Sequence, residues 1–142
     1  MQTVKQILKE KGNHIWSIGP EELVFSAVKR MDEKGIGALL VLENDRLVGI
    51  VSERDYARKV ILRNKASKET PVRDIMSTRV IYVSPDYTAE ECMALMTKHH
   101  VRHLPVMDDG DLIGLVSIGD VVRAMINDKD FIIDQLERYI TG

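Results

Sequence analysis

The same pattern of apolar and polar positions occurs twice along the chain. An apolar run that ends in Ser-x-x-Asp lies at residues 47–55 and again at residues 112–120. The runs are 65 residues apart, as Gly49 and Gly114 show, and this shift relates residues 20–61 to the second half without a gap. An internal repeat of this length indicates two copies of one supersecondary unit.

Within each copy, the spacing of apolar residues predicts the order β-α-β-β-α and therefore a mixed α/β (α+β) fold. Asn44-Asp45 and Asp108-Asp109-Gly110 have the composition of hairpin turns. In the first copy we expect strands at residues 14–18, 38–42 and 47–51 and helices at residues 21–34 and 53–63. In the second copy we expect strands at residues 80–83, 104–107 and 112–116, a helix that carries Ala89 to Met96, and a helix at residues 118–126.

Short lead-in segments precede both copies. A helix at residues 3–11, with Thr3 as N-cap and Gly12 as its stop, precedes the first, and residues 72–76 are its counterpart before the second. The apolar spacing of the C-terminal tail belongs to neither copy, so we expect this tail to cap the core or to dock on another chain. The predicted organisation is a first repeat with its lead-in helix at residues 1–64, a linker at 65–71, a second repeat at 72–128 and an amphipathic C-terminal helix at 129–142.

Composition narrows the class of protein. With 142 residues, a hydrophobic share of 44% and a charged share of 30%, the chain suits one globular domain built from two halves. A net charge of −2 gives no general attraction to nucleic acid or to an anionic membrane. No apolar run is long enough to cross a bilayer and no signal peptide is visible. Cys92 is the single cysteine, which fits a reducing cytosol, so we expect a cytoplasmic protein.

The two Ser-x-x-Asp segments, Ser52 to Asp55 and Ser117 to Asp120, have two interpretations. The first is a capping box, in which the serine and the carboxylate satisfy N–H groups at the start of a helix. The second is a ligand site, because a helix N-terminus offers N–H groups to a phosphate and an adjacent carboxylate can accept the hydroxyls of a ribose. The two uses are compatible.

Basic residues near these segments favour the second interpretation. Arg54 and Arg58 are four residues apart and thus share a helical face, with Lys59 next to them. In the second copy, Arg102 and His103 precede a strand. Cations near a helix N-terminus oppose the helix dipole, so their presence suggests an anionic ligand. The alternative is that they are solvated or paired with neighbouring carboxylates.

Other candidate chemistry is weaker. His99, His100 and His103 straddle a helix end and a strand start, and no carboxylate or cysteine pattern completes a metal site, so no metal is expected. Cys92 lies on an apolar helix face, which indicates packing rather than nucleophilic attack. The sequence has no phosphate-binding Gly-Lys-Ser/Thr loop and no Gly-x-Ser-x-Gly. We therefore predict no catalytic residues and no enzyme activity.

The sequence resembles a tandem pair of cystathionine-β-synthase (CBS) domains of the bacterial stand-alone type. The resemblance rests on residues 38–41, 47–55, 103–106 and 112–120 and on the lead-in at 72–76, and it covers nearly the whole chain. It implies two repeats related by a pseudo-two-fold axis, with their sheets facing each other. It also implies a homodimer and two clefts that bind adenine nucleotides: AMP, ADP, ATP, S-adenosylmethionine or NAD(H).

The resemblance further implies roles for particular residues. Asp55 and Asp120 match the positions that hold ribose hydroxyls, and Ser52 and Ser117 match positions that contact ribose or phosphate. The other implied ligand-binding residues are the phosphate-binding cations Arg54, Arg58, Lys59, Arg102 and His103, the adenine-reading backbone at Ala38 and His103, and the cleft-lining residues Gly19 and Ser84.

Two departures indicate that the clefts are unequal, because Gly119 replaces the cation at Arg54 and Ala124 replaces Lys59. The predicted function is a regulatory adenine-nucleotide sensor of energy or redox state. It would act through a conformational change in a dimer and signal to an unidentified effector protein. Two alternatives stay open: a ligand-free module for protein interaction or dimerisation, and a nucleotide hydrolase.

Overall fold

The computed structural model describes residues 1–141, which form two compact units. The central unit is continuous and spans Ile15–Val80. The terminal unit combines Met1–His14 with the chain from Ile81 onward. Each unit joins a small sheet to helices, so the predicted mixed α+β class is confirmed.

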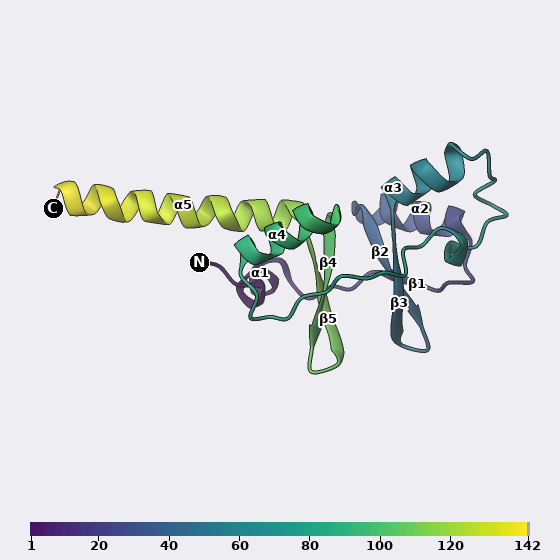
Figure 1. Cartoon of the computed structure of the whole chain (residues 1–142), viewed down its shortest axis with the longest axis horizontal. Coiled ribbons are helices and arrows are strands. Elements are labelled where there is room, and N and C mark those ends of the chain that lie inside the picture. The colour runs from purple at the N-terminus through teal and green to yellow at the C-terminus, as the bar shows by residue number, and fades with distance from the viewer. Residues whose placement is uncertain (142) are drawn as a thin grey trace. The chain divides into compact units, whose positions relative to one another are not determined.

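The central unit contains a three-stranded sheet in the order β1-β2-β3, with β1 parallel and β3 antiparallel to β2 (Figure 1). Leu39, Val41 and Val51 of the sheet are buried against the apolar face of α2, because alternate strand residues and every third or fourth helix residue point the same way. Its elements are β1(Ser17–Ile18), α2(Val24–Lys34), β2(Ala38–Glu43), β3(Arg46–Ser52), α3(Glu53–Tyr56), the π-helix η1(Ala57–Ile61) and the 3₁₀ helix η2(Val72–Asp74).

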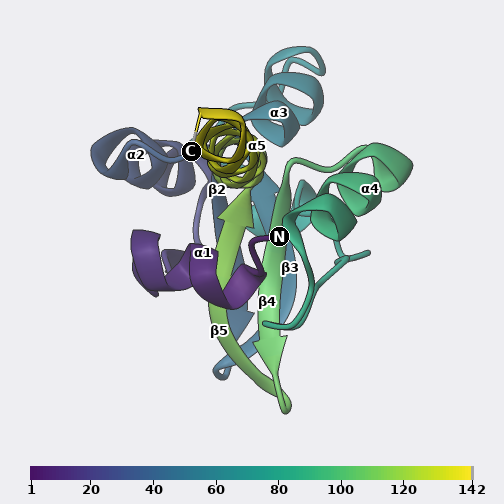
Figure 2. The same cartoon turned by 90° about the vertical axis from the view of Figure 1, so that its left-hand side faces the viewer.

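The terminal unit contains a two-stranded antiparallel sheet with α1 and α4 beside it (Figure 2). Its core brings Leu104, Val106 and Val116 of the sheet together with buried residues of α1, α4 and α5. Its elements are α1(Val4–Lys11), α4(Ala89–His99), β4(His103–Asp108), β5(Asp111–Ser117) and α5(Ile118–Thr141).

Both predicted hairpin turns are confirmed. Asn44 and Asp45 have φ values of 51° and 63°, and Asp109 and Gly110 have values of 52° and 86°. Two successive residues with positive φ match the twist of the strands that they join, and Asn, Asp and Gly are the residues that accept this conformation.

Some predicted elements have other bounds. The first strand is reduced to β1, and the strand expected at residues 80–83 is a single parallel bridge between Val83 and Val106. The helix expected at residues 21–34 begins at Val24. The helix expected at residues 53–63 has one α-helical turn and then becomes the π-helix η1, in which the N–H of Leu62 reaches the carbonyl of Ala57.

The largest difference is that the helix expected at residues 118–126 and the separate C-terminal helix form one continuous helix, α5. The four residues that join them, Asn-Asp-Lys-Asp at 127–130, are polar but include neither glycine nor proline. Polarity alone therefore does not end this helix.

Neither lead-in segment packs with the repeat that directly follows it. The first, α1, belongs to the terminal unit, and the second, residues 72–76, belongs to the central unit. Leu8 of α1 lies over Gly114, where an added Cβ would be 2.8 Å from its Cδ2 atom. Met76 lies over Gly49 in the same way, at 2.9 Å. The compact units therefore differ from the repeats expected at residues 1–64 and 72–128, because buried apolar residues of each lead-in complete the other repeat's core.

Candidate functional site

Each unit has one corner where a strand runs directly into a helix. In the central unit, β3 ends at Ser52, which lies opposite Ala38, the first residue of β2. In the terminal unit, β5 ends at Ser117, which lies opposite His103, the first residue of β4. We call these the central corner and the terminal corner. The repeat therefore places equivalent residues in equivalent positions.

The central corner contains a complete capping box. The Ser52 N–H donates to Asp55 Oδ2 at 2.9 Å, and the Asp55 N–H donates to Ser52 Oγ at 3.2 Å. Lys59 Nζ forms an ion pair with Asp55 Oδ1 at 3.1 Å. The same ammonium donates a hydrogen bond to the carbonyl oxygen of Ile75 at 2.9 Å. One cation thus holds Asp55, whose side chain keeps 17% of its surface exposed.

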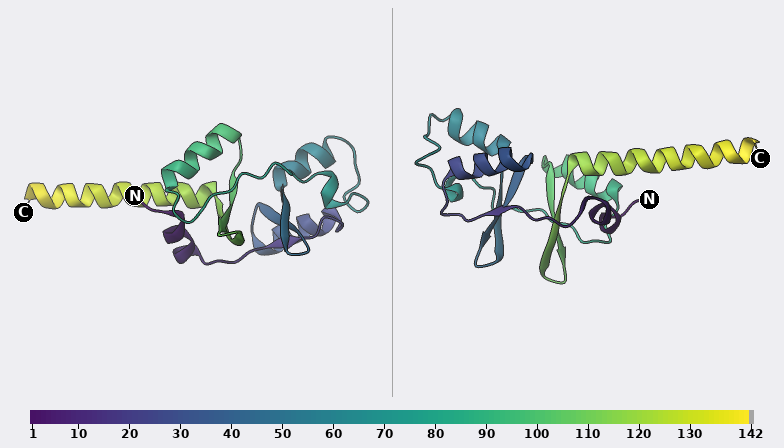
Figure 3. Two further views of the ribbon diagram at one scale, coloured as in Figure 1. Left: turned by 60° about the horizontal axis from the view of Figure 1, so that its bottom comes forward. Right: turned by 180° about the vertical axis from the view of Figure 1, so that it is seen from behind.

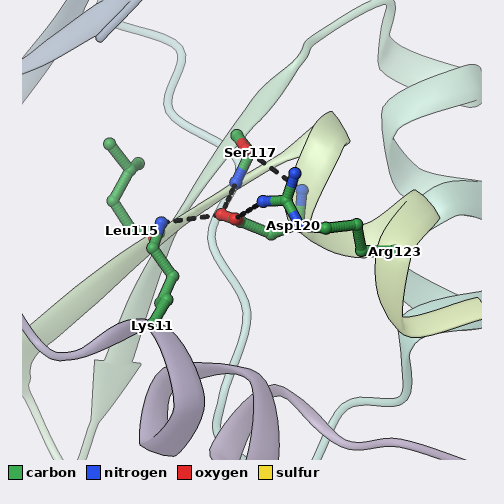
Figure 4. Close-up of polar contacts among 5 residues, drawn as sticks. All are labelled: Lys11, Leu115, Ser117, Asp120 and Arg123. Atoms are coloured by element: carbon green, nitrogen blue, oxygen red, sulfur yellow. Dashed lines mark hydrogen bonds and ion pairs between the residues drawn. The ribbon is translucent and has the colours of Figure 1, made fainter. Parts of the chain in front are cut away.

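The terminal corner is filled more completely (Figure 4). Lys11 Nζ lies 2.6 Å from Asp120 Oδ2 and 2.9 Å from the carbonyl oxygen of Leu115. The Ser117 N–H donates to the same carboxylate oxygen at 2.8 Å, and Arg123 Nη2 lies 2.8 Å from Asp120 Oδ1. Two cations therefore hold Asp120, and only 7% of its side chain is exposed.

The charges in the terminal corner change two pKa values. Burial by itself raises the pKa of Asp120, but the hydrogen bonds and charge of Lys11 and the hydrogen bonds from Ser117 outweigh it, so this pKa lies below its usual value. Burial and the charges of Lys11 and Arg102 lower the pKa of His103 against the opposing effect of Asp120. His103 is consequently neutral, and Asp120 ionised, at pH 7.

The two arginines beside the central corner, Arg54 and Arg58, have no partner of opposite charge in the described part of the chain. Arg54 and Arg58 are both exposed, and neither forms an ion pair with any residue between positions 1 and 141. In the terminal unit, the repeat partner of Arg58 is Arg123, which is bound to Asp120. Arg102, which precedes the terminal corner, is also exposed and forms no ion pair within residues 1–141. Two unpaired cations therefore border the central corner, and one borders the terminal corner.

The structure divides the twelve predicted ligand-binding residues between the units. Gly19, whose N–H donates to Glu22 at 2.7 Å, lies in the central unit with Ala38, Ser52, Arg54, Asp55, Arg58 and Lys59. Ser84, Arg102, His103, Ser117 and Asp120 lie in the terminal unit. Gly19 and Ser84 do not lie at the corners: they follow Ile18 and Val83, which pair with Val41 and Val106, toward the hairpin end of each sheet. Lys59 is bound to Asp55 rather than extended toward solvent.

Lys11 was not predicted from the sequence. It lies in the last turn of α1, where a lysine is ordinarily explained by the helix dipole. Its contact with Asp120 arises because α1 packs in the terminal unit, and the apolar pattern of α1 does not say which repeat it joins.

The single cysteine, Cys92, was predicted to serve in packing. Cys92 is fully buried in the core of the terminal unit, and burial raises the pKa of its thiol to about 11, with a smaller effect of Glu91. This agrees with packing rather than nucleophilic attack.

Within residues 1–141, no group of three or more His, Cys, Asp or Glu side chains is placed to hold a metal ion. In the same range, none of the helices has both the length and the apolar character that a membrane span requires.

Comparison with known proteins identifies the family. The model of the CBS domain matches twice, at residues 4–62 and 72–127. The chain belongs to the CBS domain family. It is 39% identical, over 99% of its own length and 72% of the relative's, to the mitochondrial CBS domain-containing protein CBSX3 of Arabidopsis thaliana. It is 30% identical to the CBS domain-containing protein YhcV of Bacillus subtilis, covering 91% of this chain and 90% of the relative.

A solved CBS-domain structure supports the fold directly. A protein from Burkholderia ambifaria, assigned to signal transduction, is 54% identical and superposes with a TM-score of 0.86, covering 89% of this chain and 96% of the other. The fold is thus that of a tandem CBS pair, and proteins with such pairs are commonly regulatory.

Proposed function

We propose that this CBS protein is a regulatory sensor of an adenine nucleotide, such as AMP, ATP or NAD(H), and that the central corner is its principal site. The observation that carries the proposal is the difference between the two carboxylates. Asp55 is held by one lysine beside two unpaired arginines, whereas Asp120 is buried under Lys11 and Arg123.

In this proposal Asp55 accepts the hydroxyls of the ribose and Ser52 contacts the ribose or the first phosphate. An ionised carboxylate makes stronger hydrogen bonds with hydroxyl donors than a neutral acceptor does. Lys59 leaves Asp55 when the ribose binds and turns its flexible side chain toward the phosphates. Arg54 and Arg58 supply the remaining positive charge, which the phosphates need because the whole chain is slightly acidic.

The terminal corner is proposed to bind weakly or not at all. A ribose there would have to displace Lys11 from a carboxylate that it contacts at 2.6 Å, and the cation equivalent to Arg54 is missing because residue 119 is glycine. We therefore expect one nucleotide per chain. His103 and Arg102 would bind a second nucleotide only after Lys11 moves.

The sensor would act by binding one conformational state more tightly than another, within a cytoplasmic homodimer that signals to an effector protein. A second candidate is a ligand-free interaction module. The observation that favours it is that Ser52 and Asp55 already form a complete capping box, which accounts for both residues without a ligand.

Isothermal titration calorimetry of the full chain with AMP, ATP and NADH separates the candidates. The sensor predicts saturable heat for at least one of them at submillimolar to millimolar concentration. A flat titration with all three at millimolar ligand would refute the sensor and favour the interaction module.

A further inference from the structure

The second half of α5 is exposed on all sides. Every residue from Lys129 to Thr141 has an exposed side chain, and the helix extends past α1 and α4 in both views of Figure 3. Within residues 1–141, the last hydrogen bond that another element donates to α5 is that from the Gln2 N–H to Asp128 Oδ2, at 2.9 Å. The core of the terminal unit holds α5 only through residues near its start, such as Val121 and Ala124.

Apolar residues on α5 follow a heptad repeat throughout its length. Counting from Val122 as position a, six of the seven a and d positions between residues 118 and 139 are apolar, and the exception is Lys129. Three successive e positions are isoleucine. The a positions are Val122, Lys129 and Leu136, the d positions are Ile118, Met125, Ile132 and Tyr139, and the e positions are Ile126, Ile133 and Ile140. We call these residues the α5 stripe.

The α5 stripe exposes more apolar surface than an isolated chain usually does. Leu136 is 56% exposed, Ile140 79% and Tyr139 87%. With roughly 150–250 Å² for a large side chain, the stripe exposes on the order of 800 Å². The largest apolar patch of a typical monomer is about 300–600 Å². About 800 Å² is what each partner contributes to a stable interface of standard size.

We propose that the α5 stripe packs against the same stripe of a second copy of this chain, as a pair of helices. A sustained heptad with apolar a and d positions is the pattern of helices that pair with each other. A face that includes e as well as a and d is wide enough to be buried by a helix of the same kind. This interface requires no nucleotide, so it goes beyond the proposed function.

Lys129 marks the centre of the stripe, because residue 129 lies midway between Ile118 and Ile140. Two stripes that overlap along their whole length therefore bring Lys129 of one copy close to Lys129 of the other. One lysine in an apolar seam is a known means of fixing the register of paired helices.

Hydrogen exchange of the full chain over a range of concentrations tests the proposal. The stripe variant Ile133→Asp/Leu136→Asp places two charges in the seam. The control Asn127→Asp/Gln135→Glu adds the same two charges to the same helix, outside the stripe. We expect the amides of residues 129–141 to be protected at high concentration in the wild type and the control. They should exchange at least tenfold faster in the stripe variant, with unchanged exchange in β4 and β5.

Two results would overturn the proposal. The first is exchange of residues 129–141 at the rate of a free helix at every concentration of the wild type. The second is equal protection in the stripe variant. Overlap along the whole stripe is tested by Lys129→Cys under oxidising conditions, with the buried Cys92 out of reach. We expect rapid formation of a disulfide-linked dimer, because residue 129 is the midpoint of the stripe. A variant that stays free of cross-links would overturn this overlap.

Discussion

At the scale of single residues, two carboxylates that occupy equivalent positions in a repeat have different surroundings. Asp55 and Asp120 both complete a turn with the preceding serine. Lys11, which comes from outside the repeated segment, adds a second cation to Asp120 alone. A duplicated sequence can thus give two unequal sites, in part through a residue that the duplication does not contain.

Removing the Lys11 ammonium should destabilise the protein in a pH-dependent way. We expect Lys11→Met to lower the free energy of unfolding at pH 7 by about 1 kcal/mol. This is the contribution of a charged hydrogen bond after its reduction by solvent screening. Because the folded pKa of Asp120 is lowered, this stabilisation is fully present above the carboxyl pKa of the unfolded chain, about 3.9. It is lost progressively as the pH falls from that value through the folded pKa. Urea unfolding at pH 7 and pH 3 measures the difference, and an equal loss at both values would contradict the assignment.

The repeat also supplies a matched pair for nucleotide binding. Asp55→Ala should weaken the nucleotide by about 1–3 kcal/mol, the loss of a charged hydrogen-bond partner, as measured by calorimetry. Asp120→Ala is the matched control, because it removes the equivalent carboxylate and the equivalent helix cap from the terminal corner. We expect it to leave the affinity for the nucleotide unchanged. Equal effects of the two substitutions, or none from Asp55→Ala, would mean that Asp55 serves only as a cap.

The sequence indicated the residues of both corners because Ser-x-x-Asp recurs at a fixed shift. It did not indicate the position of Lys59, which was expected to face phosphates and instead pairs with Asp55. Nor did it indicate Lys11. Long cationic side chains can reach several acceptors, and their choice depends on tertiary packing that local spacing does not contain.

At the scale of elements, the close approach of α1 to β5 depends on Gly114. A methyl group there would lie 2.8 Å from Leu8, so Gly114→Ala should cost about 1–3 kcal/mol through overpacking. The double variant Gly114→Ala/Leu8→Ala shortens the side chain that the new methyl group would meet. We therefore expect it to be destabilised by less than the sum of the two single substitutions, as measured by urea unfolding. If the destabilisation by the two substitutions were purely additive, the contact with Leu8 would not be the cause of the cost of Gly114→Ala.

Gly49 provides the contrast to Gly114. A methyl group there would meet both Met76 and the backbone carbonyl of Ser77, each at 2.9 Å. Because the carbonyl cannot be shortened, Gly49→Ala should not be rescued by Met76→Ala in the same assay.

Most elements follow from apolar spacing, and the exceptions have physical causes. The hairpins were predictable because Asn, Asp and Gly accept positive φ. The full length of α5 was not, because the polar residues at 127–130 resemble a linker although none of them interrupts a helix. The π-helix at Ala57–Ile61 has no pattern in the sequence that we can identify, and such turns often lie near functional sites.

At the scale of the whole molecule, the compact units are not the sequence repeats. Ile7 and Ile75 are counterparts in the two lead-ins, and both are buried, but Ile7 belongs to the core of the terminal unit and Ile75 to the core of the central unit. The presence of two repeats could be read from the sequence. The assignment of each lead-in to a core could not, since both lead-ins present similar apolar faces.

Two equivalent substitutions test this exchange of lead-ins. Ile7→Ala should destabilise by about 2–5 kcal/mol, as for other large-to-small core changes, and should speed hydrogen exchange mainly in β4 and β5. Ile75→Ala should do so mainly in β2 and β3. If each lead-in instead stabilised the repeat that follows it in sequence, the two exchange patterns would be interchanged.

The central claim is that the central corner binds an adenine nucleotide and that the terminal corner is closed by Lys11. Native mass spectrometry of the full chain, saturated in turn with AMP, ATP and NADH, tests it most directly. The account predicts one bound nucleotide per chain, with a lower occupancy in Asp55→Ala and an unchanged occupancy in Asp120→Ala at the same nucleotide concentration. No bound nucleotide with any of the three, or loss in Asp120→Ala with retention in Asp55→Ala, would contradict it.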